Sequence, residues 1–138
     1  MTSSPFCIVH ETITDFAAAI NSHDLEKIAA LMSDDHTFID SHGNEMTGKE
    51  TMKAGWASYF GLFSDYYVEI EQIFSKGDVA MACGFAGAGT GENAWRIPAA
   101  WRAIVRDGKI ELWQVYADTK IQFERMRTSA SNRTTTPS

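Results

Sequence analysis

The sequence has few cysteines, no run of basic residues and no long apolar segment. Its two cysteines, Cys7 and Cys83, are not part of a C-x-x-C pair, so neither a zinc finger nor a redox motif is indicated. The first residues, MTSSPFC, lack the basic and long apolar regions of a signal peptide. No apolar stretch approaches the roughly 18 to 20 residues of a membrane span. The simplest interpretation is a reduced cytoplasmic protein that does not enter a membrane.

The charge and length of the chain further restrict the class of protein. The net charge is −6 with no cluster of lysine or arginine, which argues against a nucleic-acid partner. The 138 residues suit one domain with a sizeable core. We expect a single domain over residues 1–126. The polar segment 127–138, RTSASNRTTTPS, has no apolar pattern and is expected to be a disordered tail.

The hydrophobic periodicity changes near residue 65. Before it, residues 6–21 and 24–32 and the segment from 47 onward have helical spacing, and Thr47 and Glu50 have the spacing of a capping box. After it, apolar and polar residues alternate through several runs separated by turn residues, as in antiparallel strands. Three helices followed by these strands predict an α+β fold with the helices on one face of a curved sheet.

The aromatic and bulky residues are the candidates for an apolar pocket. In VAMACGFAGAG, Met81, Cys83 and Phe85 share one strand face, which we expect to point inward. Trp56 falls on the apolar stripe of the third helix, and Trp101 lies on a later strand. Tryptophans in a small domain usually fill the core, but several together can also wall a ligand site.

Asp40 ends the apolar run HTFID and allows three interpretations. Strand alternation puts His36, Phe38 and Asp40 on one face, where a carboxylate without a partner would have a raised pKa and could act as a base. Alternatively, Asp40 accepts hydrogen bonds from the SHGN turn that follows. A metal site with His36 and His42 is disfavoured, because four strand residues separate His36 from Asp40 by about 13 Å. We expect no metal.

Several of these segments resemble a known family. FAAAINSHDLEKIAALMSDDHTFID followed by GKETMKAGW resembles the opening of the SnoaL-like and ketosteroid isomerase-like proteins, and VRDGKIELWQVYAD resembles their closing hairpin. The likeness covers about residues 6–124. It implies the nuclear transport factor two-like cone (cystatin-like), in which three N-terminal helices pack in the concave face of a strongly curved, mainly antiparallel sheet. It also implies a homodimer through the outer face of the sheet.

The resemblance gives Asp40 a role. In ketosteroid isomerases an aspartate base acts with a tyrosine and a protonated aspartic acid. The base ends the first strand after a D-D-x-x-x-x-D run, which DDHTFID reproduces. The tyrosine position matches Phe16, which cannot donate a hydrogen bond, and the acid position falls at or beside Trp101, whose indole N–H can. The aspartate–arginine–aspartate set of limonene epoxide hydrolase has only apolar counterparts here.

The resemblance therefore implies a cofactor-independent isomerase or cyclase acting on an apolar, carbonyl-type molecule. Asp40 would transfer the proton, Trp101 would donate a hydrogen bond to the substrate, and His42 would assist as in the polyketide cyclases. The alternatives are a non-catalytic module that binds an apolar ligand and a dimerisation domain whose cone is filled by its own side chains. The residues expected to line the pocket are Phe16, Phe38, Trp56, Tyr59, Phe60, Met81, Phe85, Trp113 and Val115.

Overall fold

Three helices lie against one six-stranded sheet in the computed structural model, which describes residues 5–118. The predicted tail at 127–138 lies outside these residues. No helix within residues 5–118 is long and apolar enough to cross a membrane. The elements in chain order are α1 (Pro5–Asn21), α2 (Leu25–Leu31), β1 (Met32–Ile39), β2 (Glu45–Thr47), α3 (Lys49–Leu62), β3 (Tyr67–Lys76), β4 (Val79–Ala88), a 3₁₀ turn (Gly91–Asn93), β5 (Trp95–Arg106) and β6 (Lys109–Ala117).

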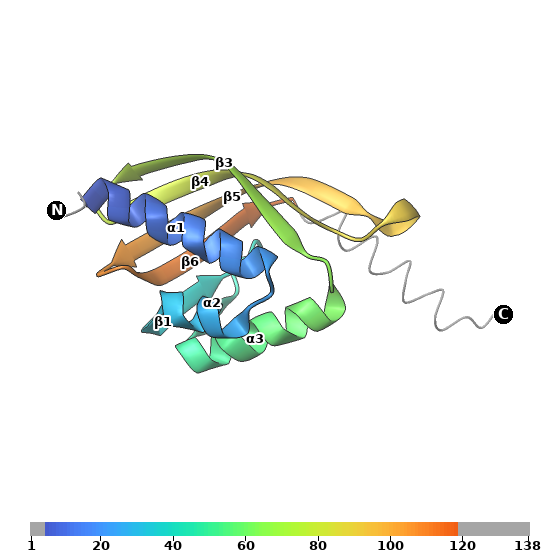
Figure 1. The fold of residues 1–138 in the computed structure, drawn as a ribbon, viewed down its shortest axis with the longest axis horizontal. Coiled ribbons are helices and arrows are strands. Elements are labelled where there is room, and N and C mark those ends of the chain that lie inside the picture. The colour runs from blue at the N-terminus through green and yellow to red at the C-terminus, as the bar shows by residue number, and fades with distance from the viewer. Residues whose placement is uncertain (1–4, 119–138) are drawn as a thin grey trace.

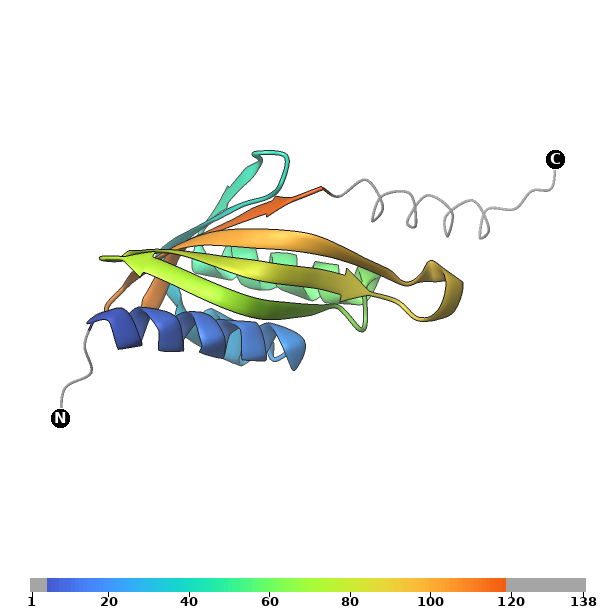
Figure 2. The same ribbon diagram turned by 90° about the horizontal axis from the view of Figure 1, so that it is seen from above.

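The sheet order is β2-β1-β6-β5-β4-β3, and every neighbouring pair is antiparallel except β1 with β6. Strands β3 to β6 form a meander of hairpins, and the parallel β1–β6 pair places the first strand beside the last. Figures 1 and 2 show the sheet curving over the helices, with α1 crossing β3 to β6 and α3 beneath β1. The predicted α+β fold with helices in the concave face of a curved sheet is confirmed.

Helix α1 buries the face that its sequence predicts. Val9, Ile13, Phe16 and Ile20, spaced four, three and four apart, are each at most 3% exposed. Burying side chains of this size stabilises a fold by about 1.5 to 3 kcal/mol each. The apolar stripe of α1 therefore forms the centre of the core between the helices and the sheet.

The start of α3 corrects one prediction. Thr47 does not cap this helix, because it belongs to β2 and pairs with Thr37 of β1. The N-cap is Gly48, which has a φ of 108° and no side-chain hydrogen bond. Glycine takes this backbone conformation readily, and it lets the chain turn directly from strand into helix. The capping-box prediction for Thr47 and Glu50 is therefore wrong.

The direction of β4 corrects a second prediction. Ala80, Ala82 and Ala86 of β4 are at most 5% exposed and face the core, so Met81 and Phe85 point outward. The Arg96 guanidinium lies 4.0 Å from the centre of the Phe85 ring on that outer face. Alternation along a strand shows which residues share a face, but it does not show which face is inward. In β4 the small side chains face inward, against the helices.

The half-buried Cys83 lies on the same outer face, so its expected core position is also wrong.

The curvature of the sheet has a local source on β3. The pairing of β3 with β4 shifts register between Ile70 and Gln72, as at a β-bulge. Gly84 faces this point, and a Cβ atom there would overlap the carbonyl oxygen of Glu69. Bulges bend and twist a strand, and a glycine in a strand often marks such a close backbone approach. This bend helps to form the concave face.

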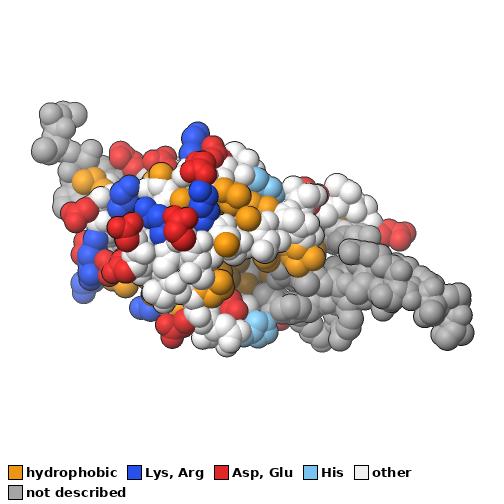
Figure 3. Space-filling view, turned by 90° about the horizontal axis from the view of Figure 1, so that it is seen from below, with side chains coloured by type: hydrophobic (Ala, Val, Ile, Leu, Met, Phe, Trp, Pro, Cys, Tyr) orange, Lys and Arg blue, Asp and Glu red, His pale blue; other side chains and the backbone are white. Residues whose placement is uncertain are grey.

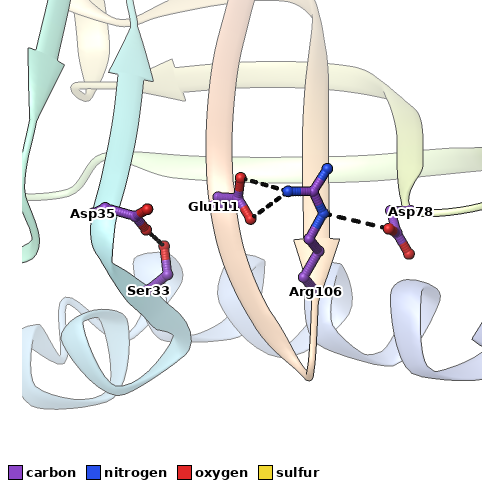
Figure 4. A network of polar contacts seen from close by, with 5 residues as sticks. All are labelled: Ser33, Asp35, Asp78, Arg106 and Glu111. Carbon is purple, nitrogen blue, oxygen red and sulfur yellow. Dashed lines mark hydrogen bonds and ion pairs between the residues drawn. The ribbon is translucent and has the colours of Figure 1, made fainter.

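Ion pairs tie the hairpins together at the surface. Figure 4 shows Arg106 between two carboxylates, with Nη1 2.9 Å from Oε1 of Glu111 and Nε 3.4 Å from Oδ2 of Asp78. Figure 3 shows basic and acidic side chains interspersed on the face seen from below. Exposed pairs of this kind contribute about 0 to 1 kcal/mol each. They fix turn positions rather than hold the fold together.

Candidate functional site

A cavity of about 290 Å³ lies between the inner face of the sheet and α3. Its volume is at the lower end of the range for small-molecule sites, so it suits a molecule of one or two rings. Its wall is mainly apolar, and most of its lining residues are aromatic or aliphatic. The lining residues are Ile20, Phe38, Asp40, Ser41, His42, Met46, Met52, Gly55, Trp56, Tyr59, Tyr66, Val68, Ala86, Trp95, Ile97, Ala99, Trp101, Trp113, Val115 and Ala117.

Neighbouring strands bring much of the predicted lining together. Phe38 of β1 pairs with Trp113 of β6, and Val115 of β6 pairs with Trp101 of β5. The side chains of all four residues line the cavity. From the opposite side, α3 contributes the predicted residues Trp56 and Tyr59. These six predicted residues therefore surround one space.

Four of the predicted lining residues lie elsewhere. Phe16 and Phe60 do not line the cavity, because they pack against the Trp56 ring from behind, with ring centroids 6.3 and 5.5 Å away. Met81 and Phe85 lie on the outer face of the sheet, so their predicted place in the pocket is also wrong.

The far wall of the cavity is a tryptophan pair. Trp101 and Trp113 stack with ring centroids 6.1 Å apart, and they are only 2% and 1% exposed. Phe16 meets the Trp113 ring edge-on at 4.9 Å. The two indoles therefore serve as core residues on one side and as lining on the other.

Asp40 directly follows β1 and borders the cavity. Its Oδ1 accepts hydrogen bonds from the backbone N–H groups of His42 at 2.8 Å and Asn44 at 3.0 Å, and its Oδ2 accepts one from the Asn44 side chain at 3.1 Å. The two interpretations of Asp40 are therefore compatible, because it accepts hydrogen bonds from its turn and also borders the cavity. The turn holds the carboxylate in place beside the cavity.

Those hydrogen bonds decide the direction in which the pKa of Asp40 shifts. Partial burial by itself raises the pKa of this carboxyl, but the hydrogen bonds from Asn44 and His42 and the charge of His42 outweigh it. The pKa of Asp40 therefore lies below its ordinary value. Asp40 is ionised at neutral pH, and it is not a carboxyl with a raised pKa.

The two predicted histidines have different positions. His42 is exposed and borders the cavity beside Asp40. His36 is fully buried and does not line the cavity, and its Nδ1 lies 2.8 Å from the carbonyl oxygen of Ile110. A carbonyl oxygen only accepts, so Nδ1 carries the proton. The buried Nε2 has no hydrogen-bond partner among the described residues, which favours the neutral ring. Within residues 5–118 no group of three His, Cys, Asp or Glu side chains could hold a metal ion.

His36 should make stability depend on pH. Burial lowers its pKa below 6.5, and the Ile110 hydrogen bond and the Asp35 charge oppose this only partly. The unfolded chain therefore binds a proton at a higher pH than the folded chain, and stability should fall as the pH drops below about 6.5. We expect His36→Asn, whose amide can still donate to Ile110, to show a smaller loss between pH 6.5 and 5 in urea unfolding. His42→Asn is the control, and an equal loss in wild type and His36→Asn would contradict the assignment.

Two aromatic lining residues were not predicted. Tyr66 precedes β3 and Trp95 begins β5, and their rings lie 6.1 Å apart. Burial, with a smaller effect from Tyr59, raises the pKa of the Tyr66 hydroxyl, so it stays protonated and able to donate. The indole nitrogens of Trp56 and Trp95 are buried without a hydrogen-bond partner among the described residues. Trp95 lies six residues before Trp101 on the same strand, so strand alternation puts both on one face.

Small residues form the floor of the cavity. Ala86 of β4, Ala99 of β5 and Ala117 of β6 line it from the sheet, and Gly55 faces them from α3. Larger side chains at these positions would fill the space. Ala86 was not expected at the cavity, because the bulky face of β4 was predicted to point inward.

The model of the SnoaL-like domain matches residues 13–113, which is most of the chain. The chain belongs to the SnoaL-like domain family. This match runs from within α1 to within β6, and it includes Asp40 and most of the residues that line the cavity. A comparison with curated proteins finds no match.

Solved structures share the SnoaL-like fold. An LEH-like epoxide hydrolase of M. tuberculosis is 19% identical with a TM-score of 0.77, covering 96% of this chain and 98% of its own. IdmH of Streptomyces antibioticus, a candidate polyketide cyclase, is 18% identical with a TM-score of 0.74, covering 86% and 98%.

A third structure contains a small ligand. A hypothetical protein of Catenulispora acidiphila with the ketosteroid isomerase-like fold, in complex with trimethylamine, is 24% identical with a TM-score of 0.70, covering 77% and 84%. At these identities, the three likenesses show the fold.

Proposed function

We propose that this SnoaL-like protein is a cofactor-independent isomerase or cyclase that uses Asp40 to move a proton on an apolar, carbonyl-bearing molecule. One observation carries the proposal: among the described residues that line the cavity, Asp40 is the only carboxylate, in a wall that is otherwise mainly apolar. A small-molecule site with few polar groups uses those groups for orientation and chemistry.

The proposed step needs only groups of this chain and the substrate. The Asp40 carboxylate takes a proton from the carbon next to the carbonyl, and the electron pair moves onto the carbonyl oxygen. Trp101, with the Tyr66 hydroxyl as a second donor, would stabilise that oxygen by hydrogen bonding. Asp40, assisted by His42, then returns the proton to a different carbon. Because a lowered pKa makes Asp40 a weak base, the donors to the oxygen must provide much of the stabilisation.

The comparisons support a small-molecule role. One structural neighbour is described as an epoxide hydrolase and another as a candidate polyketide cyclase. Both names refer to reactions of small organic molecules. Function on a shared fold depends on the site, so the class rests on Asp40 and the cavity. The alternative is non-catalytic binding of an apolar ligand. The hydrogen bonds that tie Asp40 to its turn favour that alternative, since they explain the residue without catalysis.

Filling the cavity should remove both binding and turnover. In Ala99→Leu the three added carbons enter the floor of the cavity, and we expect 2-acetylnaphthalene to bind at least about tenfold more weakly by calorimetry, since overpacking costs about 1 to 3 kcal/mol. Exchange of its methyl protons in D₂O should fall in parallel. Ala57→Leu, on the exposed side of α3, is the matched control. Equal binding by both variants would place the ligand outside the cone.

We also propose that two copies associate through the outer face of the sheet. Phe74, Met81 and Tyr116 share that face, and Phe74 and Tyr116 are 60% and 45% exposed. Exposed apolar patches commonly mark interaction sites. We expect light scattering to give twice the chain mass of 15.3 kDa, and Phe74→Lys to shift it toward the monomer. Leu62→Lys, at a 52% exposed site on α3, should leave the dimer intact. A monomeric wild type would contradict the proposal.

A further inference from the structure

We infer that the cavity selects its ligand by charge. An apolar molecule of one or two rings should bind best when it carries a protonated amine, less well as its neutral isostere, and worst as a carboxylate. The inference rests on the proposed ligand site in the cone, but it does not require that the site be catalytic.

Asp40 has acceptor capacity left for a ligand. An ionised carboxylate offers about four acceptor sites, and His42 and Asn44 use three of them. Two of those bonds go to Oδ1 and one goes to Oδ2, so Oδ2 is the oxygen with room for a further donor. An ammonium group at the cavity wall could donate to it in a charge-assisted hydrogen bond.

His42 borders the cavity beside Asp40, but no lysine or arginine among the described residues that line the cavity offsets the negative charge of Asp40 there. Lys49, Lys53 and Arg96 instead pair with Asp34, Glu26 and Glu69. The cavity therefore favours positive ligands and disfavours negative ones.

The aromatic wall is shaped to accept a cation. The ring planes of Trp56 and Tyr59 meet at 86°, and those of Tyr59 and Tyr66 meet at 89°, with centroids 6.3 and 4.8 Å apart. Rings set at right angles in succession form the corner of a box, and all three residues line the cavity. Aromatic faces attract cations through their quadrupoles, and aromatic cages of this type recognise ammonium groups. Neutral carbonyl ligands gain nothing comparable from such a wall.

Three probes with one ring system test the inference. These are 2-naphthylmethylamine, 2-naphthalenemethanol and 2-naphthoate, titrated by calorimetry at pH 8, where the aliphatic amine is protonated and the acid is ionised. For the wild type we expect the amine to bind about tenfold more tightly than the alcohol, and the alcohol more tightly than the carboxylate. In Asp40→Asn the three affinities should agree within about threefold. Glu45→Gln removes the same charge at an exposed site outside the cavity wall and should keep the wild-type order.

A second measurement needs no variant. Raising the salt concentration from 50 to 500 mM should reduce the wild-type preference for the amine, because salt screens partly exposed charges. The inference is overturned if Asp40→Asn keeps the tenfold preference for the amine over the alcohol, if the wild type prefers the carboxylate, or if none of the three probes binds. Asp40→Asn could lose the preference for the amine and still exchange the ketone protons at the wild-type rate. That result would uphold selection by charge and refute the catalytic role of Asp40, so the two proposals can fail separately.

Discussion

Asp40→Asn should reduce proton transfer by about 10² to 10⁴, the usual contribution of a positioned base. The amide cannot accept a proton, but its oxygen can still accept the backbone N–H bonds of the turn, so the loop should keep its shape. The measurement is the rate at which the methyl protons of 2-acetylnaphthalene exchange in D₂O, followed by NMR at saturating ketone. Proton exchange next to a carbonyl is the elementary step that isomerases and cyclases of this type share.

Two controls make this result specific. Glu45→Gln should exchange like the wild type, since Glu45 is exposed and does not line the cavity. Thermal unfolding should show that Asp40→Asn remains folded under the assay conditions. Exchange rates within about twofold of each other in wild type and Asp40→Asn would mean that Asp40 is not the base.

Trp113→Ala should destabilise the fold by about 3 to 5 kcal/mol, as large aromatic truncations in a core do. Trp113 is 1% exposed, stacks on Trp101 and contacts Phe16, so its loss leaves a large hole against both the sheet and α1. For a chain of this length the melting temperature should fall by about 10 to 20 °C. Urea unfolding and thermal melts measure the two quantities.

Leu62→Ala provides the comparison for that prediction. Leu62 is 52% exposed on α3, and its truncation should change the free energy of unfolding by less than about 0.5 kcal/mol. A loss below about 1 kcal/mol in Trp113→Ala would mean that the stacked tryptophans are not the centre of the core. The cavity would then lack the rigid wall that the proposed site requires.

The fold was predictable because its signals are periodic. The four-three-four spacing in α1 and the change of period near residue 65 follow from helix and strand geometry, and both reappear in the structure. The inward face of β4 was not predictable in the same way. Both faces alternate equally well, and only packing against the helices selects Ala82 and Ala86 over Met81 and Phe85.

Parts of the candidate site were likewise predictable from the sequence, and other parts were not. The family spacing predicted Asp40 and Trp101 as site residues, and the helix periodicity predicted Trp56; all three line the cavity. The direction of the Asp40 pKa depends on which backbone N–H groups of the turn reach its oxygens, and spacing does not report that. Tyr66 enters the cavity from a part of the chain 26 residues from Asp40, brought there by the curve of the sheet.

The capping box failed for a related reason. Thr47 has the right spacing to Glu50, but β2 needs Thr47 for its pairing with β1. The pairing of Thr47 with Thr37, ten positions away, therefore replaces the helix cap that the local spacing predicts. Such competition between local and tertiary preferences is invisible to a pattern read along the chain.

A crystal structure of the protein soaked with 2-acetylnaphthalene tests the central claim most directly. We predict the ring system inside the cavity between Trp56 and Ala99, with the methyl carbon about 3 to 3.5 Å from a carboxylate oxygen of Asp40, the distance of a reactive geometry. Density for the ketone on the outer face of the sheet, or inside the cavity with the methyl group directed away from Asp40, would contradict the account.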